Sequence, residues 1–278
     1  MLVLRPTYPL KGLLAVAGLA RSTFYYQCKA LIAPDRHAGL KEKIVEVFAH
    51  HKGRYGYRRV AAAIRATGVL RDPKTVQRCM VKLGLKSPVR AKRYKSFKGE
   101  IGTTAPNVLE RDFGATGVNE KWVTDVTEFK VAGGKVYLSP IMDLCTGEII
   151  TFTMDTRPSL EMATTMLRNA LDGLPDGAKP ILHSDQGWHY RMPKYQELLA
   201  GKGLIQSMSR KGNCHDNASM ESFFAVLKTE YFHLHTFKSA EELQSGVAEY
   251  IQYYNTDRIK MRLGGLTPVA YRNQLSMT

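Results

Sequence analysis

Apolar side chains recur at helical spacing through the first third of the chain. Residues 10–17 predict a short helix, Gly18 a turn, and Arg21–Gln27 a second short helix, an arrangement typical of a helix-turn-helix. From Ala38 the apolar positions again repeat every three or four residues, and Gly53 ends that helix. The segment GRYGYRRVAAAIRATG then predicts a further helix. This part of the chain is therefore expected to be a small all-α module.

The segment DPKTVQRCMVKLGL predicts the next helix of this module. Asp72 can cap its N-terminus, and Pro73 suits the first helical position, where an N–H would have no partner. Its basic and amide side chains lie outside the apolar face, and such side chains contact phosphates and base edges from a recognition helix. With two arginines of the preceding helix, the predicted DNA contacts are Arg58, Arg59, Lys74, Gln77 and Arg78. The alternative is a solvated basic helix in a small helical domain.

The periodicity changes from helical to extended after residue 106. The segments KWVTDVTEFKV, KVYLSPIMDL and EIITFTMD predict three strands, the first two joined by a two-residue turn at Gly133-Gly134. A helix over Ser159–Leu171, a strand PILHSD, a helix over Pro193–Ala200, a strand LIQSMS and a long helix from Asp216 follow. Three antiparallel strands followed by strand–helix alternation predict an α/β mixed sheet flanked by helices, the order found in ribonuclease-H-like folds.

Charge divides the chain at the same place. Residues 1–110 hold 22 Lys+Arg against 6 Asp+Glu, whereas residues 111–278 hold 18 against 19. This division indicates that the basic N-terminal part binds a polyanion and that the near-neutral C-terminal part has a different function. The densest basic stretch contains Lys92 and Arg93, and it is either a solvated linker or a segment that follows DNA phosphates.

These patterns predict four regions. They are a short helical segment (1–35), a basic helical DNA-binding module (36–85), a basic linker (86–115), and a ribonuclease-H-like core with C-terminal helices (116–278).

The chain has 278 residues, 44% of them hydrophobic, and no apolar run approaches the ~20 residues of a membrane helix. Its four cysteines are scattered without a C-x-x-C pair, so we expect reduced thiols in the cytoplasm and no zinc site.

Three acidic residues of the second half are candidates for catalysis. Asp125 lies within the first predicted strand, where a buried carboxylate needs a partner, and Asp185 ends the strand ILHSD. Glu221 lies on the helix that follows Asp216-Asn217. Two aspartates on adjacent strands and a glutamate from a crossing helix can share two hard divalent cations, the arrangement that phosphodiester transfer requires.

Helical spacing extends this candidate site. Asn217, Glu221 and Lys228 fall on roughly one helix face, so Lys228 can hold a DNA phosphate near the cations, and Asn217 is a further candidate for DNA contact. The alternative for Lys228 is an exposed cation near a helix end. We interpret His183 and His189, which bracket Asp185, as polar core or rim residues and not as ligands.

Several segments together resemble the OrfB-type transposases of bacterial insertion sequences, in the IS-three group. They are GRYGYRRV, WVTDVTEF, LHSDQGWHY, SMSRKGNCHDNASMESFF, TFKSAEEL, YIQYYNTDRI and GLTPVAYR, and the resemblance runs from about Ala38 to the end of the chain. It implies a core similar to that of retroviral integrases. Asp125, Asp185 and Glu221 would then be the D-D-E ligands of two Mg²⁺ ions, with Mn²⁺ able to substitute, and Lys228 would contact the transposon end.

The resemblance also implies a reaction. A 3′-hydroxyl is exposed at an end of the element and is then joined to DNA without a covalent protein intermediate. The partners implied are double-stranded DNA, the OrfA product or an OrfAB fusion, and further copies of the chain on DNA, at the bacterial nucleoid. Two alternatives stay open: a metal-dependent nuclease of the same fold, and a non-catalytic DNA-binding modulator of the full transposase.

Overall fold

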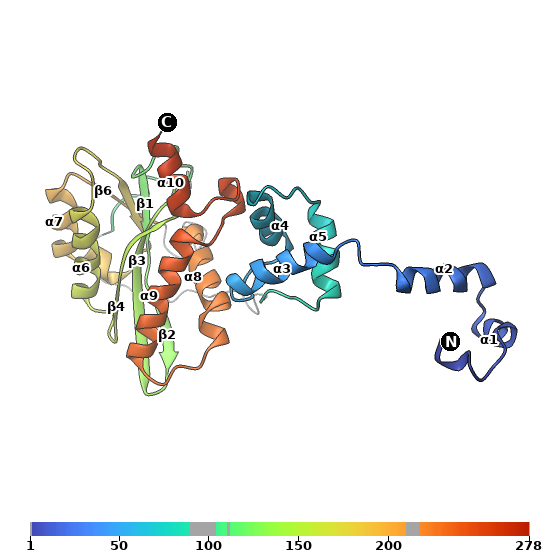
Figure 1. Cartoon of the computed structure of the whole chain (residues 1–278). Helices are drawn as coiled ribbons and strands as arrows, with labels where there is room; N and C mark the ends of the chain where they lie inside the picture. The colour runs from blue at the N-terminus through green and yellow to red at the C-terminus, as the bar shows by residue number, and fades with distance from the viewer. Residues whose placement is uncertain (1, 89–103, 110–111, 210–216, 278) are drawn as a thin grey trace.

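Three parts follow one another along the chain in Figure 1: a pair of N-terminal helices, a bundle of three helices, and a larger part built on a sheet. The computed structural model describes residues 2–88, 104–109, 112–209 and 217–277.

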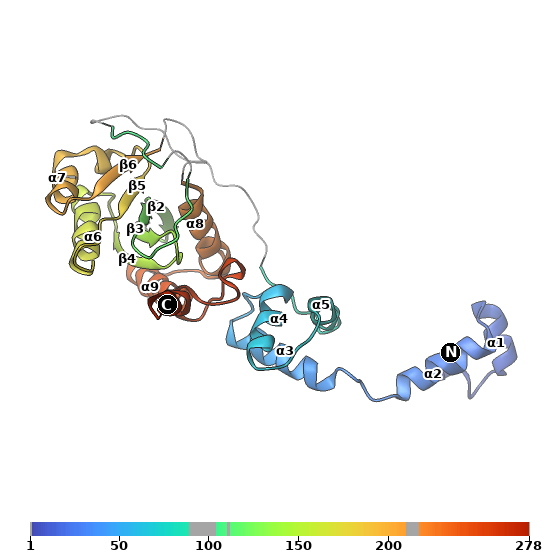
Figure 2. The same ribbon diagram turned by 90° about the horizontal axis from the view of Figure 1, so that it is seen from above.

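The N-terminal pair consists of α1 (Leu10–Ala17) and α2 (Arg21–Ile32), after a single 3₁₀ turn at Leu2–Leu4. Gly18 ends α1 in the left-handed region with φ of 61°, which confirms the predicted turn. The second helix continues five residues beyond Gln27, where its sequence pattern is less regular. In Figure 2 this pair lies apart from the rest of the molecule.

The three-helix bundle has the boundaries that its glycines and its cap indicate. Ile44, Val60 and Val76, one from each helix, are 0% exposed and pack in one core. Asp72 accepts hydrogen bonds from the backbone N–H groups of Lys74 (2.8 Å) and Thr75 (3.2 Å), as predicted for an N-cap. The helices are α3 (Ala38–His50), α4 (Tyr57–Ala66) and α5 (Pro73–Lys82).

The larger part is built on a mixed sheet. Its strands are β1 (Lys121–Thr124), β2 (Thr127–Val131), β3 (Gly134–Asp143), β4 (Ile149–Asp155), β5 (Ile181–Ser184) and β6 (Ile205–Met208). β3 pairs antiparallel with β1 and β2 along one edge and with β4 along the other. β1 pairs parallel with β5, and β5 with β6, which gives the order β2-β3-β1-β5-β6. The predicted mixed sheet is confirmed.

Helices cover both faces of this sheet (Figures 1 and 2). Strand side chains alternate between the faces, so the neighbours Trp122 and Val123 belong to different cores. The Trp122 core includes α6 (Leu160–Asp172) and α7 (Pro193–Gly201). The Val123 core includes α8 and α9. The remaining helical elements are the 3₁₀ turns Trp188–Arg191, Phe232–Leu234 and Met261–Leu263, with α8 (Ala218–Glu230), α9 (Ala240–Thr256) and α10 (Pro268–Ser276).

Two predictions about the first strands were wrong in detail. KWVTDVTEFKV is two strands, because Asp125 and Val126 lie between β1 and β2. The hairpin turn is Ala132-Gly133, since Val131 pairs with Gly134, and Gly133 has the positive φ of 82°. Gly134 therefore already belongs to β3.

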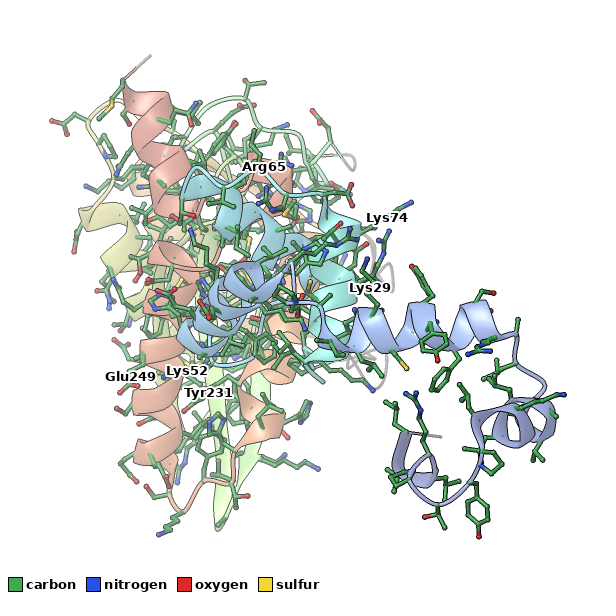
Figure 3. All side chains as sticks on the ribbon, turned by 45° about the vertical axis from the view of Figure 1, so that its right-hand side comes forward. Lys29, Lys52, Arg65, Lys74, Tyr231 and Glu249 are labelled. Carbon is green, nitrogen blue, oxygen red and sulfur yellow. The ribbon has the colours of Figure 1, made fainter. Side chains whose placement is uncertain are left out.

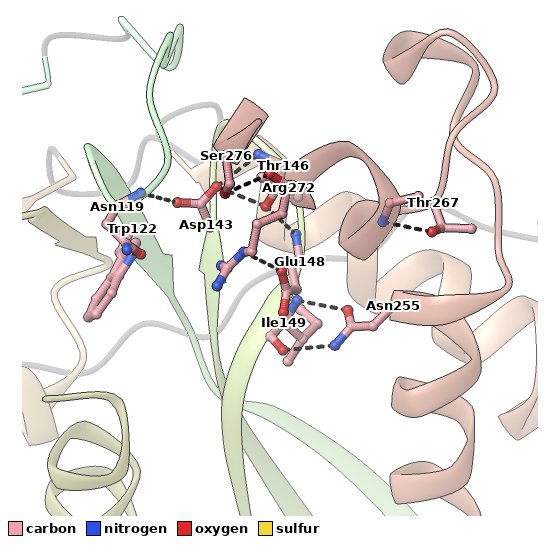
Figure 4. Close-up of polar contacts among 12 residues, drawn as sticks. Asn119, Trp122, Asp143, Thr146, Glu148, Ile149, Asn255, Thr267, Arg272 and Ser276 are labelled. Atoms are coloured by element: carbon pink, nitrogen blue, oxygen red, sulfur yellow. Dashed lines mark hydrogen bonds and ion pairs between the residues drawn. The ribbon is translucent and has the colours of Figure 1, made fainter. Parts of the chain in front are cut away.

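The C-terminal helices are fastened to the β3–β4 hairpin by polar contacts (Figure 4). The side chain of Asn255 on α9 donates to the carbonyl of Ile149 (2.9 Å) and accepts from its N–H (3.0 Å). Arg272 on α10 forms an ion pair with Glu148, at 2.7 Å between Nε and Oε2. These contacts hold α9 and α10 on the sheet.

Candidate active site

Asp125 lies at an interruption of an otherwise continuous ladder. Thr124 pairs with Ile141 and Thr127 with Leu138, so the same register places Asp125 opposite Pro140. Proline has no N–H to donate to a ladder, and the Pro140 carbonyl instead accepts from the Thr124 hydroxyl (2.9 Å). The Asp125 carboxylate accepts from the Val126 N–H at 2.7 Å. The strand pairing is thus interrupted at Asp125, and its register is the same on both sides of the interruption.

Asp185 is placed beside Asp125 by parallel pairing. Val123 of β1 pairs with His183 of β5, and both aspartates follow two residues later, so they share one end of neighbouring strands. Adjacent strands lie ~4.8 Å apart, which brings the two carboxylates close together. Gly187 donates its N–H to Asp185 Oδ1 at 2.8 Å, and a Cβ at Gly187 would lie only 2.8 Å from the same oxygen. A side chain at position 187 would therefore displace the carboxylate.

Helix α8 brings Glu221 to the same end of the sheet. Asn217, the N-cap residue of α8, donates its side-chain N–H to the Thr124 carbonyl at 3.1 Å and so fastens the helix to the last residue of β1. Glu221 follows one turn later on the same face. Asn217 is 5% exposed, and its Oδ1 is buried without a hydrogen-bond partner among the described residues. The structure thus places Asn217 inside the site and not on an outer DNA-contacting surface.

The three carboxylates interact electrostatically. Burial raises the pKa of Asp125 well above its usual value, and the charges of Asp185 and Glu221 raise it further, against the Val126 hydrogen bond and the Lys228 charge. Burial also raises the pKa of Asp185, which the Gly187 hydrogen bond partly offsets. Like charges held together in a half-buried site favour either protonation or a bound cation. The geometry is therefore that of a site that a cation would stabilise.

The donor set fits a hard divalent cation. It consists of carboxylate oxygens and the unpartnered amide oxygen of Asn217, and oxygen is the ligand that Mg²⁺ prefers. Among the residues that the structure describes, no three His, Cys, Asp or Glu side chains form a ready-made metal site. Asp185 and Glu221 are thus both within electrostatic reach of Asp125, but the three are not drawn together into a coordination shell.

Lys228 and the two histidines have partners inside the fold. The Lys228 ammonium donates to the Thr127 hydroxyl at 2.7 Å and lies 5.1 Å from the Phe129 ring centroid, and burial lowers its pKa. His183 is 0% exposed, with Nδ1 at 2.8 Å from the Ser207 hydroxyl. His189 Nε2 donates to the Pro158 carbonyl at 2.9 Å. Both histidines are therefore core residues, as the sequence indicated.

The predicted DNA contacts of the bundle separate into two groups. Lys74, Gln77 and Arg78 are exposed on one outer face of α5, and Figure 3 shows Lys74 projecting from the molecule. Arg58 is also exposed and donates to the Tyr57 hydroxyl at 3.2 Å. Arg59 instead faces the larger part, at 3.7 Å from Glu230, because its half-buried guanidinium needs a counter-charge. Lys92 and Arg93 lie outside the described residues.

Sequence reasoning missed the residues that hold the carboxylates in place. Thr124, Pro140 and Gly187 carry no catalytic chemistry, so composition and motif chemistry do not select them. Two signals were available: a proline inside a predicted central strand, and a glycine two residues after a candidate ligand.

No helix among the described residues is long and apolar enough to cross a membrane.

Comparison with known proteins gives consistent matches along the chain. The Integrase core domain family matches residues 115–214, a second family of that description matches residues 221–275, and an HTH-like domain family matches residues 35–93. The putative transposase InsK for insertion sequence element IS150 of Escherichia coli K12 is 53% identical over 274 residues, covering 99% of this chain and 97% of InsK. The transposase InsF for insertion sequence IS3A of the same organism is 32% identical, covering 96% and 95%.

Two further comparisons are with a longer transposase and with a solved structure. The probable transposase for insertion sequence element IS1353 of Shigella flexneri is 38% identical over 278 residues, and the match covers 99% of this chain but 54% of that protein. Among solved structures, the HTLV-2 integrase catalytic core domain in complex with magnesium is 16% identical with a TM-score of 0.44, covering 56% of this chain and 97% of that domain.

Proposed function

Because this chain belongs to the integrase-core transposases of IS150- and IS3-type insertion sequences, we propose that Asp125, Asp185 and Glu221 are its catalytic D-D-E carboxylates. The observation that carries the assignment is geometric: the register of β1 on β5 sets Asp125 beside Asp185, and Asn217 fastens the start of α8, which bears Glu221, to the end of β1. Asp125 follows β1, Asp185 follows β5 and Glu221 lies on α8, and this arrangement supports the proposal.

We infer that the same carboxylates would hold two Mg²⁺ ions, for which Mn²⁺ would substitute. When bound, the metal would supply Lewis-acid stabilisation of the charge that develops on the phosphate oxygens. The fit rests on the all-oxygen donor set, which includes the buried Oδ1 of Asn217. The HTLV-2 integrase core, which carries the same type of domain, was solved with magnesium.

Lys228 is the residue to which we assign the orientation of the DNA at the site. We assign Lys228 to a phosphate next to the cleaved bond, because its ammonium lies against Thr127, two residues after Asp125. Hydrolysis at an end of the element breaks the P–O3′ bond and leaves a 3′-hydroxyl, and that hydroxyl then attacks a second phosphodiester. The first step consumes one water molecule and leaves a 5′-phosphate on the other fragment, and the second step releases the 3′-hydroxyl of the attacked strand, so each step exchanges one P–O bond for another.

We assign to the outer face of α5 the binding of the DNA at the end of the insertion sequence. Lys74, Gln77 and Arg78 are exposed side by side there, with Arg58 on the neighbouring helix, and such groups contact phosphates and bases from a helix in the major groove. Transposition joins two ends of an element, so several copies of the chain would act together on DNA at the bacterial nucleoid. The IS1353 transposase is nearly twice as long as the matched region, which supports a contribution from an OrfA portion.

Glu221→Gln tests this function. The exchange keeps the shape of the side chain and removes its charge, and Glu197→Gln, on an exposed position of α7, is the matched control. Purified protein is incubated with a labelled duplex of its own element end and Mg²⁺, and the products are resolved on a denaturing gel. We expect at least a ~10³-fold loss of cleavage and joining for Glu221→Gln, unchanged DNA binding, and full activity of the control.

Other outcomes select the alternatives. Shortened strands without joined products would favour a nuclease of the same fold. DNA binding without any metal-dependent reaction, even after the OrfA portion is supplied, would favour a non-catalytic modulator. Substantial strand transfer by Glu221→Gln would refute the site assignment.

A further inference from the structure

The three-helix bundle and the larger part meet at one buried carboxylate, Glu230, the last residue of α8. Glu230 is 6% exposed and accepts two hydrogen bonds from Arg258, at 2.8 and 2.7 Å. The Tyr250 hydroxyl donates to the same carboxylate at 2.9 Å. From the bundle, Arg59 approaches Oε1 to 3.7 Å, and Arg54 Nε donates to the Glu230 backbone carbonyl at 3.2 Å.

Arg54 of the bundle is buried in this junction. It lies in the loop between α3 and α4 and is 6% exposed. Its guanidinium lies 4.5 Å from the ring centroid of Tyr253 and 5.1 Å from that of Tyr250, both on α9. A desolvated cation against aromatic faces is a specific and favourable contact. The loop is thus anchored between two tyrosines of the catalytic half.

The same loop makes further contacts around Arg54. The His51 ring stacks on Tyr55 with centroids 3.6 Å apart, and its Nδ1 lies 3.2 Å from the Tyr253 hydroxyl. The Tyr55 hydroxyl donates to the Asp257 carbonyl at 3.0 Å and accepts from the Ile259 N–H at 2.9 Å. These bonds reach the segment after α9, so the bundle is held at several points along one surface.

The charge balance makes Glu230 the central group. Two guanidinium groups, Arg59 of the bundle and Arg258 of the larger part, lie at the Glu230 carboxylate, and the buried Arg54 binds the Glu230 backbone carbonyl. A buried charge is tolerated only when it is paired, so removal of the carboxylate leaves cations from both parts of the molecule facing each other. The junction is therefore expected to open when Glu230 loses its charge.

Glu230 lies on the same helix as the catalytic candidates. It follows Glu221 by nine residues, ~13.5 Å along a straight helix, and Lys228 by two. A packed helix of this length behaves as a rigid element, so the position of the bundle is coupled to that of Glu221. We propose that Glu230 is a positioning residue that fixes the DNA-binding bundle on α8, so that DNA held by α5 meets the catalytic carboxylates at one defined distance.

This inference rests on the proposed function, and it concerns the accuracy of cleavage. Successive base pairs are ~3.4 Å apart along DNA, so a bundle that shifts by a few ångströms presents a neighbouring phosphodiester to the site. The junction would then determine which bond is cut, whereas Asp125, Asp185 and Glu221 determine whether any bond is cut.

The test compares Glu230→Gln with Glu249→Gln, an exposed acid of α9 whose position is labelled in Figure 3. The full chain is used, and the 3′ ends formed on a labelled element-end duplex are mapped at single-nucleotide resolution. We expect Glu230→Gln to bind DNA within ~3-fold of the unsubstituted chain. Its cleavage products should spread over two or more neighbouring positions, while Glu249→Gln cuts at one. A loss of folding alone would lower every product in proportion, so an unchanged product distribution would overturn the proposal.

Hydrogen exchange gives a second readout that does not need catalysis. Amides of residues 51–56 should exchange at least ~10-fold faster in Glu230→Gln, while those of the sheet keep their protection. If Glu230→Gln does not fold, Arg54→Gln serves instead, because it leaves the Arg258–Glu230 pair intact. Absence of cutting by the unsubstituted chain, even after the OrfA portion is supplied, would refute the proposed function, whereas unchanged exchange at residues 51–56 would refute the role of Glu230.

Discussion

Replacement of Gly187 by alanine should disable the site while leaving the fold intact. Gly187 has φ of −55° and ψ of 140°, a conformation that alanine adopts without strain. Its new Cβ, however, would lie 2.8 Å from Asp185 Oδ1 and 3.3 Å from Tyr190 Cδ2. Tyr190 is 1% exposed and has little room to move, so the Asp185 carboxylate must yield.

The size of the effect follows from what the carboxylate loses. The Gly187 N–H bond to Asp185 is charge-assisted, and such a bond contributes ~1.5–3 kcal/mol. Misplacement of a catalytic group by about 1 Å costs ~10²-fold in rate. We therefore expect the turnover number of cleavage to fall ~100-fold. The free energy of unfolding should fall by no more than the ~1.5–3 kcal/mol of the lost hydrogen bond.

The assay is single-turnover cleavage of a labelled element end at saturating protein, with thermal unfolding measured in parallel. Gly134→Ala is the matched control, because Gly134 is exposed and a Cβ there meets no atom within 4 Å. Raising the Mg²⁺ concentration should recover part of the lost rate if Asp185 is a ligand. Cleavage by Gly187→Ala at the unsubstituted rate would refute the argument that this glycine positions the carboxylate.

Three further predictions concern the bundle. Burial lowers the pKa of His51 from 6.5 to about 4, so the stability that the neutral ring contributes is fully present above pH 6.5 and is lost as the pH falls toward 4. At pH 4.5 the loss should be ~1–3 kcal/mol in chemical denaturation, and His51→Phe should abolish it. An equal loss of stability in His51→Phe would contradict this prediction. Asp72→Ala removes the cap of α5 and should cost ~1 kcal/mol in the same assay, against a change near zero for Gln77→Ala. Lys74→Ala should reduce the slope of log binding constant against log salt by ~1, and an unchanged slope would exclude a phosphate contact.

Most of the fold could be predicted from periodicity because its elements are locally consistent. The Asp72-Pro73 start of α5, the α6 helix capped by Ser159, and the terminal helix after Pro268 all appear where their caps indicate. The interruption at Asp125 has no signal near Asp125 itself, because it depends on Pro140, a residue of another strand, and that proline was the one indication in the sequence. The alternation of side chains across β1 is unaffected by the break, so no local signal marks it.

The candidate site divides in the same way. Asp125, Asp185 and Glu221 were predicted because their chemistry and order are specific; the structure brings the charges of Asp185 and Glu221 near Asp125, and their catalytic role stays a prediction. The inward positions of Asn217 and Arg59 were not found, since helical spacing gives the face of a residue but not what packs against that face. Glu230 was missed for a similar reason: its partners Arg54, Arg59 and Arg258 come from distant segments.

The two-residue turn Ala132-Gly133 has a consequence for natural variation. It sets the register of β2 on β3, and the same register continues through β1, so this turn also determines that Asp125 lies opposite Pro140. One inserted residue would move every pair by one position and turn each side chain to the other face of the sheet. Loops elsewhere can change length as copies of the element diverge, but insertions in this hairpin should be absent from copies that still transpose.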